Sequence, residues 1–216
     1  MNKETGEKME RWIDYFLLGL LAFGGLGLEL ILKIIEDVIS KNSINYIIHW
    51  ILICIIWGIF VFTLIKHSKK SKILMSFMYK SKAGFKDIII STVILLAVVV
   101  FSNALFWEGF KPAQEFKNLG VSKFIFQYVY YLFEIVLVVL IIAFGQKAGE
   151  LLFKNTFVPW GGIFLGLTWG IVHSFTQNFS TGIVLLFASV LFGSVYILLR
   201  KNIFYTYLFI FLMFVL

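Results

Sequence analysis

The sequence has few charged residues for its length. Of its 216 residues, 14% are charged and 60% are hydrophobic, and the mean hydropathy is +0.93. A soluble globular domain has about 25% charged and about 45–50% apolar residues. The composition therefore excludes an ordinary soluble domain.

Cysteine and proline are also scarce. The single cysteine, Cys54, lies within an apolar run, so the chain has no disulfide framework and no CxxC site. The presence of only two prolines and the lack of internal repeats argue against linkers and solenoids. We therefore predict a single all-α, polytopic membrane domain over residues 1–216.

Long apolar runs supply the helices of this domain, because a helix needs about 20 apolar residues to cross a bilayer. The predicted spans are residues 15–35, 44–65, 88–107, 124–157, 161–176, 181–199 and 203–216. The polar start is followed by a run long enough to span, so we expect the first helix to be retained rather than cleaved. The last run, about 21 Å long as a helix, is shorter than the approximately 30 Å hydrocarbon core. It is expected to enter partway, to thin the bilayer or to be incomplete.

The net charge of +7 is first a signal of topology. With the N-terminus inside, 14 of the 19 basic residues fall on the inner segments and 5 on the outer ones. Basic residues near span ends stay on the cytoplasmic side, so we predict a cytoplasmic N-terminus in a bacterial cytoplasmic membrane. The expected partner is the lipid bilayer, and no nucleic acid is expected. The basic cytoplasmic loop at 66–86 also contains apolar residues at 73–79 that suit a short helix on an anionic leaflet.

Ionisable residues within the apolar runs are the candidate functional residues, because a charge at bilayer depth costs at least about 2.5–3.5 kcal/mol. They are Glu29, Glu134, Glu150 and His173, with His49 and Glu108 nearer the predicted interfaces. Glu29 follows three glycines, Gly24, Gly25 and Gly27, which allow a second helix to approach closely. Its carboxyl has either a structural role in a helix interface or a functional one. Glu134 is expected to be structural.

Glu150 and His173 flank a turn signal at Pro159, Gly161 and Gly162. If one helix runs to 157 and the next begins near 163, Glu150 lies about 11 Å before the turn and His173 about 15 Å after it. This hairpin predicts that the two side chains share one depth.

Neighbouring residues extend this predicted site. Gln146, Glu150 and Lys154 recur at i, i+4 on one helix face, and Trp169 precedes His173 by one turn. A stripe of small residues would let the two helices pack closely enough for Glu150 to contact His173. The stripe consists of Gly162, Gly166, Gly170 and Ser174. A carboxylate and an imidazole in a partly dry cavity can activate water and stabilise an oxyanion. The alternative is a structural hydrogen-bonded pair.

Three segments of the C-terminal part resemble a known family. They are Gly149-Glu-Leu-Leu-Phe-Lys154, Trp169-Gly-Ile-Val-His173 and Phe192-Gly-Ser-Val-Tyr-Ile-Leu-Leu-Arg-Lys201. Together they resemble the core of the CPBP family, the CAAX-processing and bacteriocin-processing (Abi) intramembrane endopeptidases, over residues 124–216. The family motifs are a Glu-Glu pair followed by three residues and Arg, then Phe, three residues and His, then His, three residues and Asn or Asp.

The chain departs from these motifs at several positions. Gly149 replaces the first Glu, Lys154 the Arg and Trp169 the Phe, whereas Glu150 and His173 match. The His and Asn of the third motif would fall near Ile210 and Phe214, which are both apolar. The resemblance leaves a zinc ion open as a cofactor, although Glu150 and His173 alone are an incomplete ligand set for a catalytic zinc.

The resemblance implies an intramembrane peptidase that cleaves a peptide or membrane-protein substrate near the cytoplasmic face. Glu150 would act as general base, His173 would orient water or stabilise the oxyanion, and Gln146, Lys154 and Trp169 would support them. The alternative is a catalytically silent relative that serves as a scaffold, in bacteriocin immunity or in binding an envelope partner. A third class, a small-solute transporter, is motivated by Glu29 and Glu134, but the sequence lacks paired interrupted helices in two corresponding halves.

Overall fold

The computed structural model describes residues 11–40, 45–107 without 71–81, and 109–216. Its helices are α1 (Trp12–Ser40), α2 (Tyr46–Lys70), α3 (Phe85–Phe106), α4 (Lys111–Phe153), α5 (Trp160–Leu165), the π-helical segment η2 (Gly166–Gly170), α6 (Ile171–Thr176), α7 (Phe179–Leu198) and α8 (Ile203–Val215). Residues 73–79 of the predicted surface helix and Glu108 lie outside the described residues. The described part of the chain contains no strand, so the predicted all-α class is confirmed.

Five helices are long and apolar enough to cross a membrane: α1, α2, α3, α4 and α7. Large apolar side chains on them face outward. Val38 is 77% exposed, Phe62 67% and Phe85 79%. An apolar surface of this extent suits contact with lipid rather than with water. The fold is therefore that of a helical membrane protein.

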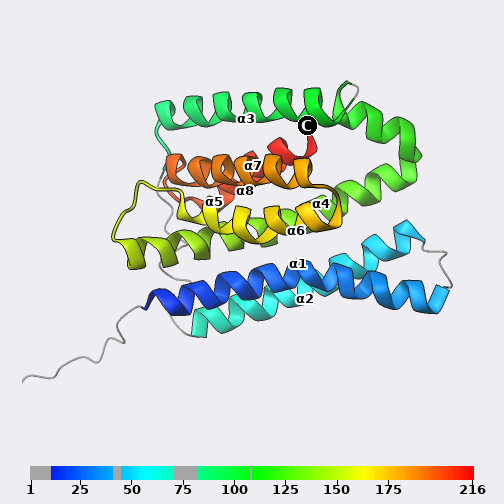
Figure 1. Ribbon diagram of the computed structural model, residues 1–216, viewed down its shortest axis with the longest axis horizontal. Coiled ribbons are helices and arrows are strands. Elements are labelled where there is room, and N and C mark those ends of the chain that lie inside the picture. The colour runs from blue at the N-terminus through cyan, green and yellow to red at the C-terminus, as the bar shows by residue number, and fades with distance from the viewer. Residues whose placement is uncertain (1–10, 41–44, 71–81, 108) are drawn as a thin grey trace, which may run out of the picture.

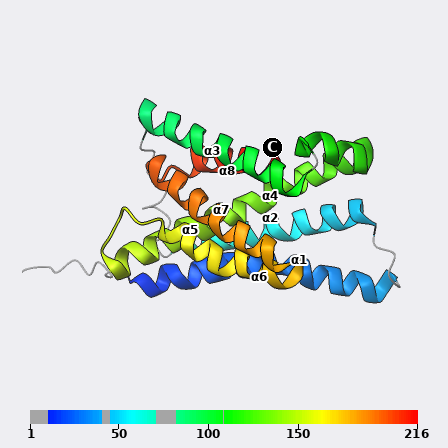
Figure 2. The ribbon, with the colours of Figure 1, turned by 45° about the horizontal axis from the view of Figure 1, so that its top comes forward.

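α4 is the central helix and contacts α1, α2, α5 and α8. Figures 1 and 2 show α1 and α2 on one side of it, whereas α7, α8 and then α3 lie on the other. α3 contacts α7 and α8. The middle of α4 is completely enclosed, with Ile135, Leu137, Ile141 and Ile142 at 0% exposure. The core of the molecule therefore surrounds α4.

The helices run back and forth between two ends of the bundle, as Figure 1 shows. At one end, here called the α1–α2 end, α1 leads into α2 and α3 leads into α4. At the other, the α4–α5 end, α4 leads into α5 and α7 leads into α8, and α1 and α3 begin there. The segments predicted to be cytoplasmic thus meet at the α4–α5 end. Which side of a membrane this end faces stays a prediction.

α4 bends back on itself at Gly120, whose φ of 70° is in the left-handed region that favours glycine. The fold-back is visible in the hydrogen bond from Tyr131 Oη to Glu115 Oε1, at 2.8 Å, between residues that a straight helix would hold about 24 Å apart. The predicted span at 124–157 agrees at its start, to within about three residues, with the part of α4 that follows Gly120, but its predicted end was wrong. α4 begins at Lys111 and ends at Phe153, since Lys154 adopts the left-handed conformation with φ 52°.

α8, the short last helix, ends against side chains of the α1–α2 end rather than in solvent. Carbonyl groups of its last residues accept hydrogen bonds from Asn103 Nδ2, at 2.6 Å to Leu216, and from the Lys111 ammonium at Phe214. Tyr128 Oη donates to Val215 at 3.3 Å. The last carbonyls of a helix have no partner within it, and they carry partial negative charge. A lysine and two neutral donors therefore stabilise the end of α8 inside the bundle.

Candidate functional site

The predicted partners Glu150 and His173 lie at different depths in the bundle, about 20 Å apart along the helix axes. α4 ends three residues after Glu150, about 4.5 Å along its axis. The next helix begins at Trp160, so that His173 is 13 residues, about 20 Å, beyond its start. The prediction that the two side chains share one depth was wrong. α4 ends at Phe153 rather than at 157, and α5 begins at Trp160 rather than near 163. Glu150 is therefore closer to the turn than predicted, and His173 is farther from it.

Close packing between α4 and α5 fixes this register. A Cβ added to Gly149 would overlap the side chain of Trp160, and one added to Gly145 would lie 2.8 Å from Phe164 Cβ. The two helices are therefore antiparallel, with Gly149 beside Trp160 and Gly145 beside Phe164. Glu150 lies next to the start of α5, far from His173.

The stripe of small residues packs against α7 rather than against α4. A Cβ added to Gly193 of α7 would lie 2.6 Å from Gly162 Cα, and one added to Gly170 would lie 3.2 Å from the backbone nitrogen of Leu186. At the far end of the stripe, a Cβ on Gly182 would overlap Ser174. The stripe was correctly predicted as a close-packing surface, but its partner helix was not.

Glu150 is held in an ion pair that the sequence did not suggest. Its Oε1 lies 2.7 Å from Lys201 Nζ and accepts a hydrogen bond from Gln146 Nε2, also at 2.7 Å. Gln146 further accepts from Gly161 N and donates to the carbonyl of Val158, so that it ties α4 to the start of α5. Gln146 and Glu150 lie on one helix face, as their i, i+4 spacing predicted. Lys154, which was predicted to continue this face, lies beyond the end of the helix and is exposed.

His173 contacts its own helix. Its Nδ1 lies 2.8 Å from the carbonyl oxygen of Trp169, and the two ring centroids are 4.6 Å apart. The predicted spacing of one turn between Trp169 and His173 thus places the two rings in contact. The π-helical segment η2 ends three residues before His173, and Thr168 Oγ1 within it donates to the carbonyls of Phe164 and Leu165. Hydroxyls that bond back to the preceding turn bend helices, which accounts for the irregularity.

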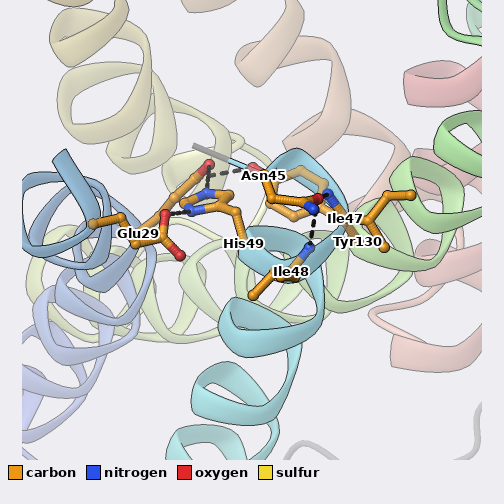
Figure 3. Close-up of polar contacts among 7 residues, drawn as sticks. Glu29, Asn45, Ile47, Ile48, His49 and Tyr130 are labelled. Carbon is orange, nitrogen blue, oxygen red and sulfur yellow. Dashed lines mark hydrogen bonds and ion pairs between the residues drawn. The ribbon is translucent and has the colours of Figure 1, made fainter. Parts of the chain in front are cut away.

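The α1–α2 end carries a polar cluster built around His49, which is only 6% exposed (Figure 3). Its Nδ1 lies 2.6 Å from Glu36 Oε2, and its Nε2 lies 3.6 Å from Glu29 Oε1. Glu29 Oε2 accepts a hydrogen bond from Tyr130 Oη of α4 at 2.9 Å. An imidazole that faces a carboxylate oxygen on each side donates to both only when it carries two protons. The cluster therefore joins α1, α2 and α4 through groups that can share protons.

Sequence reasoning identified Glu29 and His49 but did not pair them. The hairpin between α1 and α2 is the signal that was available. Glu36 lies four residues before the end of α1, and His49 lies three residues after the start of α2, so that they share one depth. Glu29 and Glu36 are seven residues apart and thus on one helix face.

The prediction that the glycines before Glu29 allow close helix packing holds for one of the three. A Cβ added to Gly25 would lie within 3.2 Å of Phe60 and Leu137, whereas one added to Gly24 or Gly27 would have no neighbour within 4 Å.

A second polar group at the same end surrounds Glu115, which is 4% exposed. Tyr131 Oη and Gln127 Nε2 donate to Glu115 Oε1, at 2.8 and 3.2 Å. Lys111 lies over the rings of Tyr131 and Phe214, at 5.1 and 5.0 Å from their centroids. These contacts secure the folded-back start of α4. Glu134, one turn beyond Tyr130, is also buried.

An apolar layer separates the two polar ends. Along α4, every residue from Ile135 to Gly145 is apolar, and ten of the eleven are buried, with Val136 intermediate. This stretch spans about 17 Å along the helix axis. Among the described residues, the polar side chains of α4 therefore do not form a continuous path from one end to the other.

Groups of three or more His, Cys, Asp or Glu side chains placed to hold a metal ion are not found in the described part of the chain. The carboxylates of the α1–α2 end are instead bonded to His49, Tyr130 and Tyr131. No family model, no curated protein and no solved structure matches the chain.

Proposed function

We propose that this chain is a catalytically silent membrane protein that acts by binding. The observation that carries the proposal is the separation of Glu150 from His173 by about 20 Å along the helix axes. The base and the oxyanion partner of the predicted peptidase are therefore not in one place. General-base catalysis requires the base within about 2.6–3.2 Å of the proton it removes, or one water away.

The surroundings of Glu150 support a structural role. Its carboxylate faces Lys201 at the turn between α7 and α8, and Gln146 orients it from the preceding helical turn. The Lys201 ammonium, 2.7 Å away, occupies one carboxylate oxygen as a charge-assisted hydrogen-bond donor. Glu150 thus joins the end of α4 to the start of α8.

The second part of the proposal concerns the arrangement in the membrane. We place the α4–α5 end, where α1 and α3 begin, on the cytoplasmic side, in keeping with the count of basic residues along the sequence, and the α1–α2 end outside. The short helices α5–α6 and α8 complete a bundle of seven apolar segments. The outer end then presents the polar residues to a ligand or to an envelope partner. The apolar layer along α4 counts against a transport path between the two sides.

Peptide cleavage is the activity that distinguishes the binding proposal from a peptidase. The full chain, reconstituted in lipid nanodiscs, would be incubated with a peptide library and with extracted membrane proteins, and new termini would be identified by mass spectrometry. We expect the same background of termini for the parent, Glu150→Gln and His173→Ala. A set of termini that the parent generates and that both variants lose would overturn the proposal. Lys154→Gln, at an exposed position outside the Glu150 pair, is the control for nonspecific effects of substitution.

A further inference from the structure

A pocket of about 360 Å³ lies at the α1–α2 end, between the start of α2 and the folded-back start of α4. Six of its lining residues matter here: Tyr46, Trp50, Trp107, Glu115, Lys123 and Gln127. Its volume falls within the usual range for small-molecule sites, about 300–1,000 Å³. The walls combine aromatic rings with a few polar groups, which is the usual composition of such sites.

Two buried acceptor atoms of these wall residues have no hydrogen-bond partner. Glu115 Oε1 accepts from Tyr131 and Gln127, but Glu115 Oε2 accepts from no donor in the described part of the chain. Gln127 must turn its amide nitrogen to the Glu115 carboxylate, which leaves Gln127 Oε1 without a partner as well. An unpaired buried acceptor costs about 1–3 kcal/mol, more when it is charged. Two such oxygens on neighbouring side chains lack a donor.

The charges and rings around the pocket indicate which donor suits it. Trp50, Trp107 and Tyr46 present aromatic rings, which attract cations through their faces. Lys123 also lines the pocket, with its ammonium 5.6 Å from the centroid of Tyr46. A ligand that carried only positive charge would be repelled by Lys123, whereas one with an adjacent anionic group would pair with it.

We propose that this pocket binds a small zwitterionic ligand, in which a primary ammonium lies beside an anionic group. The ammonium lies among the aromatic rings beside the side chains of Glu115 and Gln127, and the anionic group pairs with Lys123. Such chemistry occurs in the phosphoethanolamine headgroup of a lipid and in its soluble counterpart. The inference rests on the proposed binding function and names the class of ligand.

The probes are soluble phosphoethanolamine, ethanolamine alone, phosphate alone, and nanodiscs with or without phosphatidylethanolamine in a phosphatidylglycerol background. Binding to the full chain would be followed by tryptophan fluorescence, because Trp50 and Trp107 line the pocket, and by native mass spectrometry for the lipid. We expect saturable binding of phosphoethanolamine, of the lipid, or of both, and at least tenfold weaker binding of ethanolamine or phosphate. Binding of the soluble compound identifies a soluble source, and retention of the lipid alone identifies the headgroup; either supports the proposal.

Glu115→Gln should weaken binding at least tenfold and Lys123→Gln severalfold, whereas Lys117→Gln, on the exposed face of the same segment, should leave it unchanged. Since Glu115→Gln can also disturb the fold-back of α4, Trp50→Leu provides a second variant with the same expected loss, and circular dichroism checks that each variant is folded. No saturable binding by the parent, or equal binding by folded Glu115→Gln and Trp50→Leu, would overturn the proposal. Ethanolamine bound as tightly as phosphoethanolamine would overturn the role of Lys123. The binding assays do not depend on the cleavage test. The proposal of a zwitterionic ligand can therefore be overturned while the proposal of a catalytically silent protein stands, and the reverse.

Discussion

The carboxylates at the two polar ends of the bundle have different kinds of partner. At the α4–α5 end, acids face strong bases: Glu150 pairs with Lys201, and Asp87 pairs with Arg200 at 2.9 Å. At the α1–α2 end, neutral donors do most of this work, because Tyr130 donates to Glu29, and Tyr131 and Gln127 donate to Glu115. At the α4–α5 end, ion pairs join α4 and α3 to the turn between α7 and α8. The other end retains acceptor oxygens that a ligand with donors can use.

The largest expected effect concerns His49, whose removal leaves two carboxylates without their shared partner. Hydrogen bonds to charged groups contribute about 1.5–3 kcal/mol, and the burial of His49 between two carboxylates places His49→Leu near the upper figure, about 3 kcal/mol. The measurement is thermal and denaturant unfolding in nanodiscs, followed by circular dichroism.

His173→Leu is the matched control for this prediction. Among the described residues, its ring hydrogen-bonds with the carbonyl of Trp169 in its own helix, so that we expect the cost to be about 1 kcal/mol. If the two histidine variants were equally stable, His49 would not hold the α1–α2 end together.

A smaller effect is expected at the other end, where Lys201→Met leaves Glu150 with Gln146 as its remaining partner. Hydrogen bonds to charged groups contribute about 1.5–3 kcal/mol, and the partial exposure of Lys201 reduces this to about 1–2 kcal/mol. Lys154→Met, which removes a nearby exposed lysine, should change the free energy of unfolding by less than about 0.5 kcal/mol. Equal destabilisation by both substitutions would show that the Glu150–Lys201 pair is not a specific clamp.

The smallest effect is expected for Asp87→Asn, which breaks the ion pair with Arg200 but keeps an oxygen to accept from Gly84 N. Arg200 has a side chain that is 60% exposed. Exposed pairs contribute about 0.2–1 kcal/mol, and salt screens them. The difference in melting temperature between parent and variant should therefore shrink as salt is added. A large difference in melting temperature that does not change with salt would contradict this prediction, because it would show that the Asp87–Arg200 pair is shielded from solvent.

Hydrophobic runs were sufficient to predict the helices, because each run of apolar residues had to become a helix in a membrane. The segments at 161–176, 181–199 and 203–216 agree with α5–α6, α7 and α8 to within about two residues. Close packing by Gly162, Gly166 and Gly170 was also predictable, since glycines let backbones approach.

Two backbone conformations could not be read from the sequence, and they decided the site. Lys154 is left-handed although it is not glycine, and it ends α4 four residues early; Gly120 folds the start of α4 back. The Glu150–Lys201 pair joins residues 51 apart, so no local spacing reveals it. Glu36 lies beyond the predicted end of the first span, and so it was not considered as a partner of His49.

The central claim is that Glu150 and His173 lie about 20 Å apart along the helix axes, and a direct distance measurement tests it. Spin labels would be attached to Glu150→Cys and His173→Cys in a Cys54→Ala background, and their separation would be measured by pulsed electron paramagnetic resonance in nanodiscs. The helix rise and the register of α4 with α5 predict a distance distribution centred at about 20 Å or more. A distribution dominated by labels in contact would contradict the account and restore the shared site that the sequence predicted.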